Sequence, residues 1–478
     1  MVLGDGSNVA ACDRVTVAPF PMRPRAADPE VVWTPRLRWE ADTEALFSAF
    51  VEQLFDYPAD EDLTWPNLTV LLQDRDRNIL FNHYGQDEEA RIRLQPDCAD
   101  LPYFLRTYFA WKMRLPFGFR TCSRGRRGEL PTCGELEHPG IPHEQTDEVE
   151  AFRWFIGQRV KHGVHSASGR THPEDSATAL YPVPLTREAL RPGTVFADPY
   201  GHLLVIARWI RRARATATAS WWAPTRSPDG TVGRRRFWRG TFLFDPDTTH
   251  VGAGFKAWRP VLYDHRTRSY ESLPNERITA RAGYVPFSMQ QYEGTTDQYY
   301  ERMEAIINPR PLDPWRVQRS LIDALSESAA RRVVSVQNGE DWKARNPGAV
   351  MEMPEGGAIF LTAGPWEEYS TPARDMRMLI AMDTVMGFAG VLRRDPARFG
   401  VREDEVEAAI ARVTAQRDAE LERRSFTYRR SDASEQSVTL AQLVARARAF
   451  EVAYNPNDCV ELRWGASDGS AEVRSCAR

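Results

Sequence analysis

The spacing of apolar residues changes from helical to strand-like and back again along this chain of 478 residues. Residues 41–55 and 99–113 repeat apolar side chains every three or four positions, as amphipathic helices do. From residue 193 to about 244, short apolar runs alternate with turn residues, which predicts strands. Beyond about residue 270 the helical spacing returns. We therefore predict an α+β fold, with helices and a small antiparallel sheet in the first half and a mainly helical second half.

Turn and cap residues place the remaining elements. Asp, Pro and Gly cluster at 198–201 and 227–230, where turns are expected. Thr371 and Asp313 each precede a proline, a common start for a helix because the first helical N–H needs no partner within the helix. These signals predict helices near 148–162, 296–308, 313–335, 372–394, 403–422 and 438–453, and strands near 193–196, 202–210, 217–223 and 237–244.

The chain divides into three predicted segments: a flexible N-terminal segment over 1–30, a domain over 31–270 and a helical domain over 271–478. Residues 1–30 are polar and rich in proline, without the basic start and apolar core of a signal peptide. The longest apolar stretch, 378–392, is interrupted by Asp383 and is too short to span a bilayer. We therefore expect the mature form of an exported protein, periplasmic or extracellular, with no transmembrane segment.

The charge of the chain argues against one class of partner. The sequence contains 62 basic and 66 acidic residues, which gives a formal net charge of −4. Nucleic acids and anionic membranes attract proteins with an excess of positive charge. Neither is expected as a partner here, and the sequence does not indicate the oligomeric state.

Four of the six cysteines are arranged as two short-range pairs. Cys122 and Cys133 bracket a loop rich in Gly, Arg and Pro, and Cys459 and Cys476 bracket a predicted short strand and turn. Both pairs are predicted to be disulfides, which implies an oxidising compartment. No pair has the C-x-x-C spacing of a zinc site, so we expect no metal and no cofactor. Cys12 remains unassigned.

Cys98 and His202 form the candidate catalytic pair. Cys98 stands just before the helix expected over 99–113, where free backbone N–H groups and the helix dipole favour a thiolate. Pro102 fits only the first turn of that helix, which places its start near Asp100. His202 begins a predicted strand after a tight turn. The alternatives left open are that Cys98 is a buried structural cysteine or a disulfide partner of Cys12.

These segments resemble the NlpC-type bacterial cell-wall cysteine peptidases, which belong to the papain-like superfamily. The resemblance rests on Asp97-Cys98, on the segment 192–196 (PGTVF) and on the segment 201–206 (GHLLVI). It implies a papain-like catalytic domain over 31–270, with Cys98 as nucleophile and His202 as general base. The implied reaction is hydrolysis of an amide bond in a peptide, first of all a cell-wall stem peptide. The chain departs from the family where Ala99-Asp100 follows the cysteine instead of Ser-Gly.

Several further residues are candidates for the site. Asp198, in the turn before His202, is the candidate third catalytic residue that orients the imidazole, and Asp229, in the turn at 227–230, is the alternative. Tyr200 in the same turn is a candidate for the substrate groove. So are Trp366, in an aromatic and acidic segment, and Asp383, which is expected on the apolar face of the following helix. A carboxylate on that face needs a partner, and a neighbouring arginine is the alternative to a role in the groove.

A rival hypothesis is a non-catalytic secreted binding or scaffold protein that keeps a papain-like shape, because a fold does not determine a function. Its interaction face would comprise the helical half and the tryptophans in and around the strands. The distance between the Cys98 sulfur and the His202 ring separates the two hypotheses. These tryptophans are Trp209, Trp221, Trp222, Trp238 and Trp258.

Overall fold

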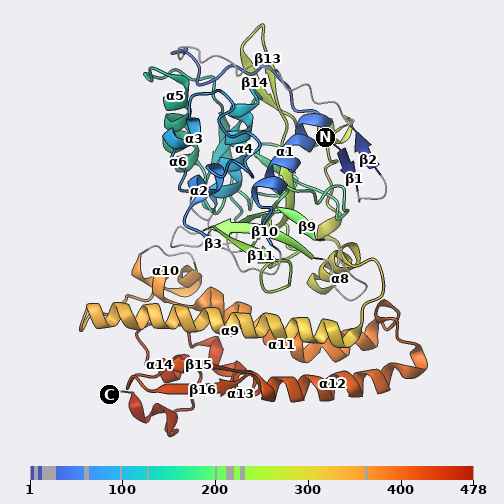
Figure 1. Ribbon diagram of the computed structural model, residues 1–478, viewed down its shortest axis with the longest axis vertical. Coiled ribbons are helices and arrows are strands. Elements are labelled where there is room, and N and C mark those ends of the chain that lie inside the picture. The colour runs from blue at the N-terminus through green and yellow to red at the C-terminus, as the bar shows by residue number, and fades with distance from the viewer. Residues whose placement is uncertain are drawn as a thin grey trace.

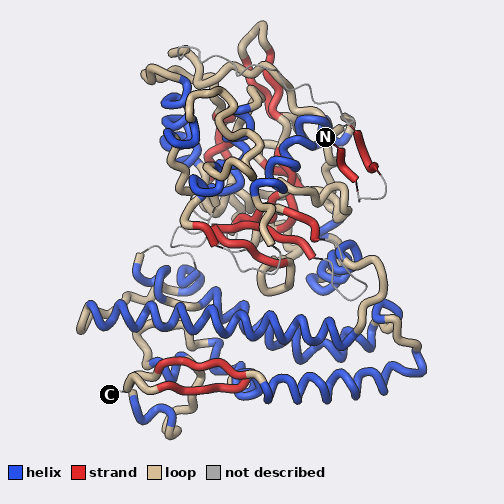
Figure 2. Tube along the Cα trace, viewed as in Figure 1, coloured by secondary structure: helices blue, strands red, loops and turns tan. Residues whose placement is uncertain are grey.

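The chain folds into two bodies that pack against each other (Figure 1). The upper body holds most of the strands, and the lower body is a layer of long helices with one hairpin (Figure 2). The mixed α+β class with small antiparallel sheets is confirmed, with 44% of residues in helices and 13% in strands. The computed structural model describes residues 2–4, 9–12, 28–58, 64–96, 99–125, 129–199, 202–210, 220–226, 232–281, 283–360 and 364–476.

A four-stranded antiparallel sheet lies at the centre of the upper body, in the order β6-β12-β7-β8. Residues on strands β7 and β8 alternate between two cores because successive side chains in a strand point to opposite faces. Val195 and Val205 face the core around helices α1 and α4, whereas Phe196 and Leu204 face the core around helix α8. The bounds of the sheet are β6 (Leu180–Pro182), β12 (Gly254–Trp258), β7 (Val195–Ala197) and β8 (Leu203–Val205).

Helix α4 (Asp100–Lys112) is buried on every side, which corrects the expectation of an amphipathic helix. Its charged residues are buried because they have partners within the same core. Arg106 pairs with Glu44 of helix α1 (Ala41–Leu54) at 2.5 Å, and Lys112 lies 2.6 Å from Glu89. The helix begins at Asp100, as the position of Pro102 predicted.

Smaller elements complete the upper body. A second antiparallel sheet has the order β3-β11-β10-β9, and three two-stranded hairpins lie around the two sheets among the described residues. These strands are β3 (Thr64–Trp65), β11 (Val232–Arg236), β10 (Ser220–Arg226), β9 (Arg208–Ile210), β1 (Val2–Gly4), β2 (Val9–Cys12), β4 (Phe119–Cys122), β5 (Cys133–Glu137), β13 (Val261–Asp264) and β14 (Ser269–Ser272), and the helices are α2 (Leu68–Leu72), α3 (Glu88–Arg91), α5 (Glu148–Trp154), α6 (Lys161–Gly163), α7 (Asn275–Thr279) and α8 (Thr296–Ile307).

The core of the upper body extends past residue 270, where the helical segment was expected to begin. Tyr299 of α8 stacks on Phe244 with ring centroids 3.6 Å apart, and Met303 lies in the same core. The region 237–244 forms turns and loop, so the strand expected there is wrong. Its phenylalanines fill this core as loop residues, which gives the segment an apolar pattern without a strand.

The lower body is built on helix α9 (Pro314–Arg345), which runs alongside helix α11 (Pro372–Arg394) (Figure 1). Both begin at the predicted prolines. Between Cys459 and Cys476 the chain forms a short helix and a 3-10 turn, so the strand expected there is wrong. The other elements are α10 (Pro365–Tyr369), α12 (Val406–Arg423), α13 (Leu440–Ala445), α14 (Val460–Arg463), β15 (Ser425–Arg429) and β16 (Glu435–Thr439).

No helix in the described part of the chain is long and apolar enough to cross a membrane.

Helices α9 and α11 are joined by a buried ion pair. Arg332 donates to the two carboxylate oxygens of Asp375 at 2.6 and 2.9 Å, and both side chains are at most 2% exposed. Removing one partner of such a pair leaves an uncompensated buried charge. We expect Asp375→Ala to lower the free energy of unfolding by about 3–5 kcal/mol in urea denaturation.

The neighbouring Arg331 provides the control, because it forms an exposed pair with Glu327 on the same helix. Arg331→Ala is expected to cost less than about 1 kcal/mol. Equal losses in Asp375→Ala and Arg331→Ala would show that the buried pair does not hold the two helices together.

Candidate functional site

Asp198 and His202 face each other across the turn between strands β7 and β8. The Nδ1 atom of His202 lies 3.4 Å from Oδ2 of Asp198, and the backbone N–H of His202 donates to Oδ1 at 2.9 Å. The carboxylate is fully buried, whereas the imidazole is 30% exposed. An aspartate at Nδ1 leaves Nε2 as the nitrogen that is able to accept a proton from a substrate or a nucleophile.

Two arginines add positive charge near this carboxylate. Arg377 of helix α11 reaches across from the lower body, with Nη2 3.7 Å from Oδ2 of Asp198. Arg170 donates to the backbone oxygen of Pro199 at 3.3 Å. Burial alone would raise the pKa of Asp198, but the charge of His202, the hydrogen bond from its backbone N–H and the charge of Arg377 hold that pKa below its ordinary value. Asp198 is therefore ionised at neutral pH.

Three of the predicted site residues, Cys98, Tyr200 and Asp229, lie outside the described residues. The structure does describe Ala99 and helix α4 directly after Cys98, and that helix packs against β8, the strand that follows His202.

A cavity of about 530 Å³ lies between the two bodies, beside the Asp198–His202 turn. Pro199 forms part of its wall, and Asp383 lines it from helix α11. Asp383 is exposed rather than on a buried face, which corrects the sequence expectation. Helix α11 has apolar residues on most of its surface, so its buried stripe could not be identified from spacing. That stripe comprises Met378, Ala381, Met382, Val385, Phe388 and Leu392.

The cavity has an apolar wall and a surplus of carboxylates. Five acidic side chains and two arginines line it. Three of the acids pair with arginines, namely Asp297 with Arg239, Glu304 with Arg398 and Glu301 with Arg394. The acids outside these pairs are Asp245 and Asp383.

Trp366 does not line this cavity. Its side chain is 3% exposed, and its indole N–H donates to the backbone oxygen of Ile359 at 3.2 Å. Its ring meets Tyr454 edge-on. Trp366 is therefore a packing residue of the lower body, and the prediction that it lines a substrate groove is wrong.

Lys256 is a buried ionisable residue near the site that sequence reasoning missed. Its ammonium donates to the backbone oxygens of Gly169 at 2.7 Å and Thr171 at 3.3 Å, on either side of Arg170. Burial, with the charges of Arg170 and Arg259, lowers the pKa of Lys256 to about 7. The sequence feature that could have identified Lys256 is a lysine inside a short apolar strand, in a chain with only four lysines.

Both predicted cysteine pairs form disulfides, Cys122–Cys133 and Cys459–Cys476. The first joins strands β4 and β5. The second lies in the lower body, far along the chain from His202.

Compared with known proteins, the chain matches no protein-family model, no curated protein and no solved structure. The resemblance to NlpC-type peptidases is therefore neither supported nor contradicted by a relative.

The pKa of Lys256 makes a prediction for stability. An unfolded lysine holds its proton up to a pKa near 10.5, so between pH 7 and that value the unfolded state binds more protons than the folded state. The Lys256 contribution to the free energy of unfolding should therefore rise with pH, by about 2 kcal/mol between pH 7 and 9. The measurement is the difference between wild type and Lys256→Met in urea denaturation at each pH.

Taking this difference cancels the other titrating groups that the two proteins share. A difference that stays constant over this pH range would show that Lys256 keeps its proton in the folded protein.

Proposed function

We propose that the protein is a thiol hydrolase that cleaves an amide bond in a peptide. Cys98 is the nucleophile, His202 the general base and Asp198 the residue that orients His202. The observation that carries the proposal is the contact between Nδ1 of His202 and the buried Asp198 carboxylate, at 3.4 Å. A base needs such a partner to hold its ring and to stabilise the imidazolium that forms.

The position of Cys98 supports the nucleophile assignment. Helix α4 begins at Asp100 with Ala99 as its N-cap, so Cys98 immediately precedes the cap. Free N–H groups at a helix start favour a thiolate and provide donors for the oxyanion of an acyl-transfer intermediate. The proposed domain is papain-like, with a central helix packed on an antiparallel sheet.

The cavity beside Pro199 is the proposed substrate groove. Its apolar wall suits a peptide side chain, and the carboxylates of Asp245 and Asp383 favour a peptide that carries a positive charge. A cell-wall stem peptide is the first candidate by resemblance. The two disulfides suit a protein exported to an oxidising compartment, so we also propose a periplasmic or extracellular location.

One observation favours the alternative of a non-catalytic binding or scaffold protein. Asp198 also faces Arg377 of the lower body, so its carboxylate is placed to join the two bodies without any catalytic role. The tryptophan face proposed for that function is weakened, because Trp258 is buried against Tyr103 and the indole of Trp209 donates to the backbone oxygen of Leu190. The side chains of Trp221 and Trp222 are outside the described residues.

Thiol reactivity tests the proposal. In a Cys12→Ala background without reductant, Cys98 is the cysteine outside the two disulfides. A thiol activated by His202 should react with iodoacetamide at pH 7 roughly tenfold faster than an ordinary cysteine of pKa about 8.5. His202→Ala should remove this advantage, and Cys98→Ala should abolish both labelling and hydrolysis of basic peptides. The readout is the alkylation rate by mass spectrometry.

The chain provides a matched control in a second, exposed His–Asp pair. Nδ1 of His250 lies 2.8 Å from Oδ2 of Asp247, and His250→Ala should leave the alkylation rate unchanged. Asp198→Asn should slow peptide hydrolysis while Cys98 stays reactive enough to label. An inert Cys98, or a Cys12–Cys98 disulfide found in the unreduced wild type, contradicts the hydrolase and leaves the binding protein.

A further inference from the structure

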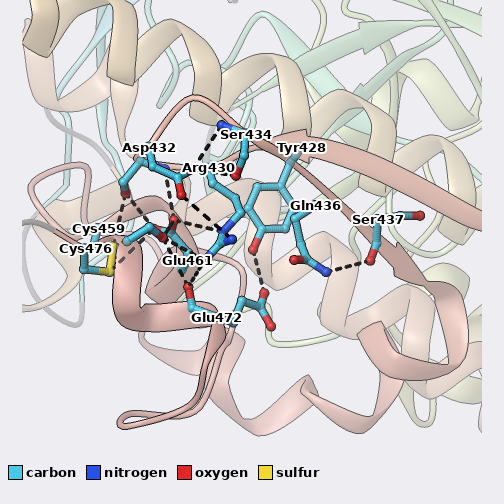
Figure 3. Close-up of polar contacts among 12 residues, drawn as sticks. Tyr428, Arg430, Asp432, Ser434, Gln436, Ser437, Cys459, Glu461, Glu472 and Cys476 are labelled. Carbon is cyan, nitrogen blue, oxygen red and sulfur yellow. Dashed lines mark hydrogen bonds and ion pairs between the residues drawn. A yellow bond between two sulfur atoms is a disulfide. The ribbon is translucent and has the colours of Figure 1, made fainter.

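The carboxylate of Glu461 lies against the Cys459–Cys476 disulfide in the lower body (Figure 3). Its Oε2 atom is 2.6 Å from the sulfur of Cys459 and 3.5 Å from the sulfur of Cys476. A disulfide sulfur carries no proton, so neither sulfur is able to donate a hydrogen bond to this oxygen while the pair is oxidised. A fully buried carboxylate oxygen thus points at two sulfurs that become ligands and donors only on reduction.

The other contacts of Glu461 hold this orientation. Ser431 donates its backbone N–H to Oε1 at 2.9 Å and its hydroxyl to Oε2 at 2.6 Å. Ser475 donates to Oε1, and Arg430 lies 3.6 Å from the same oxygen. These contacts fix the direction of the carboxylate before any ligand arrives.

We propose that Cys459, Glu461 and Cys476 form a zinc site when the disulfide is reduced. One ligand atom from each residue lies within 4.8 Å of the other two. Tetrahedral Zn²⁺, with bonds of about 2.0–2.3 Å, places its ligands roughly 3.3–3.8 Å apart, so small side-chain movements complete the geometry. Two thiolates and a carboxylate are ligands that Zn²⁺ accepts, and water takes the fourth position.

Zinc offsets most of the negative charge of the reduced site. Two thiolates and the Glu461 carboxylate carry three negative charges, which would repel one another in this partly buried site. Zn²⁺ supplies two positive charges, and Arg430, which also lies 4.0 Å from Asp432, is the nearby guanidinium that faces the Glu461 carboxylate. A monovalent ion would offset less of this negative charge. Without a metal, the repulsion opposes the formation of both thiolates.

The chemistry requires reduction first, and a dithiol is the reductant. The dithiol loses two electrons and two protons and becomes a disulfide, while the Cys459–Cys476 bond takes them up and breaks into two thiols. Zn²⁺ then displaces both thiol protons to solvent as the two sulfur–zinc bonds form. The same two cysteines are therefore a covalent clip in one state and metal ligands in the other.

The test uses the full chain carrying Cys12→Ala and Cys98→Ala, so that the two cysteine pairs are the remaining thiols. The protein is reduced with dithiothreitol, desalted without oxygen and titrated with Zn²⁺, and bound metal is counted by native mass spectrometry. We expect one Zn²⁺ per reduced chain and none per oxidised chain. Co²⁺ in place of Zn²⁺ should give the absorption of a tetrahedral thiolate complex.

Matched variants assign the ligands. Cys459→Ser with Cys476→Ser should abolish binding, whereas Cys122→Ser with Cys133→Ser, at the other disulfide, should retain one Zn²⁺. Glu461→Gln should weaken binding at least tenfold. Cys476→Ser alone removes one thiolate and leaves Glu461 with its hydrogen bonds to serine, and it should also weaken Zn²⁺ binding. This variant replaces Glu461→Gln as the test of the site if circular dichroism shows that Glu461→Gln is unfolded.

Three results would overturn the proposal: no bound Zn²⁺ in the reduced chain, Zn²⁺ bound equally by the oxidised chain, or loss of Zn²⁺ only when Cys122 and Cys133 are replaced. None of these measurements involves peptide hydrolysis, so the zinc site stands or falls separately from the proposed hydrolase.

Discussion

Buried carboxylates need compensating positive charge, and this need connects distant parts of the chain. Glu44 is paired with Arg106, Asp375 with Arg332, and Asp198 with His202 and Arg377. An isolated charge in such surroundings would lose its hydration without gaining a partner. Apart from His202, which shares a turn with Asp198, the partners come from separate elements, so each buried carboxylate fixes how two segments lie against each other.

Helix α11 contributes to two of these contacts. Asp375 reaches Arg332 of α9 within the lower body, and Arg377 reaches Asp198 in the upper body. Residues two positions apart on an α-helix point about 200° away from each other, so the two side chains leave opposite faces of α11. The helix thus links the long helices to the turn that carries His202.

Local signals in the sequence were sufficient for several features of the fold. Pro102, Pro314 and Pro372 each marked a helix start, because proline fits the first turn and disrupts later ones. The disulfides were recognised because each pair closes a short loop. Local rules failed where distant residues decide burial: loop phenylalanines at 237–244 looked like a strand, and helix α4 could be buried on all sides only because Glu44 and Glu89 supply partners.

In the candidate site, too, contacts between residues close in sequence could be predicted and contacts between distant residues could not. Asp198 and His202 are close in sequence and share one turn, so their contact could be predicted from the chain. Arg377 could not, because no local pattern indicates which arginine will reach a turn 179 residues earlier. The zinc ligands combine both cases: the cysteine pairing was predictable, but the direction of the Glu461 carboxylate depends on Ser431 and Ser475, which arrive from two other segments.

The core around helix α8 has a consequence for how this chain can be divided. Tyr299 and Met303, from beyond residue 270, fill the same core as Phe196 and Phe255 of the central sheet. A fragment ending at residue 270 would expose these aromatic rings to water and leave Asp198 without Arg377. The spacing of apolar residues changes near residue 270, but the part of the chain that unfolds cooperatively should not end there. The first point at which the chain leaves the upper core is after Ile307, in the short connection that leads to Pro314.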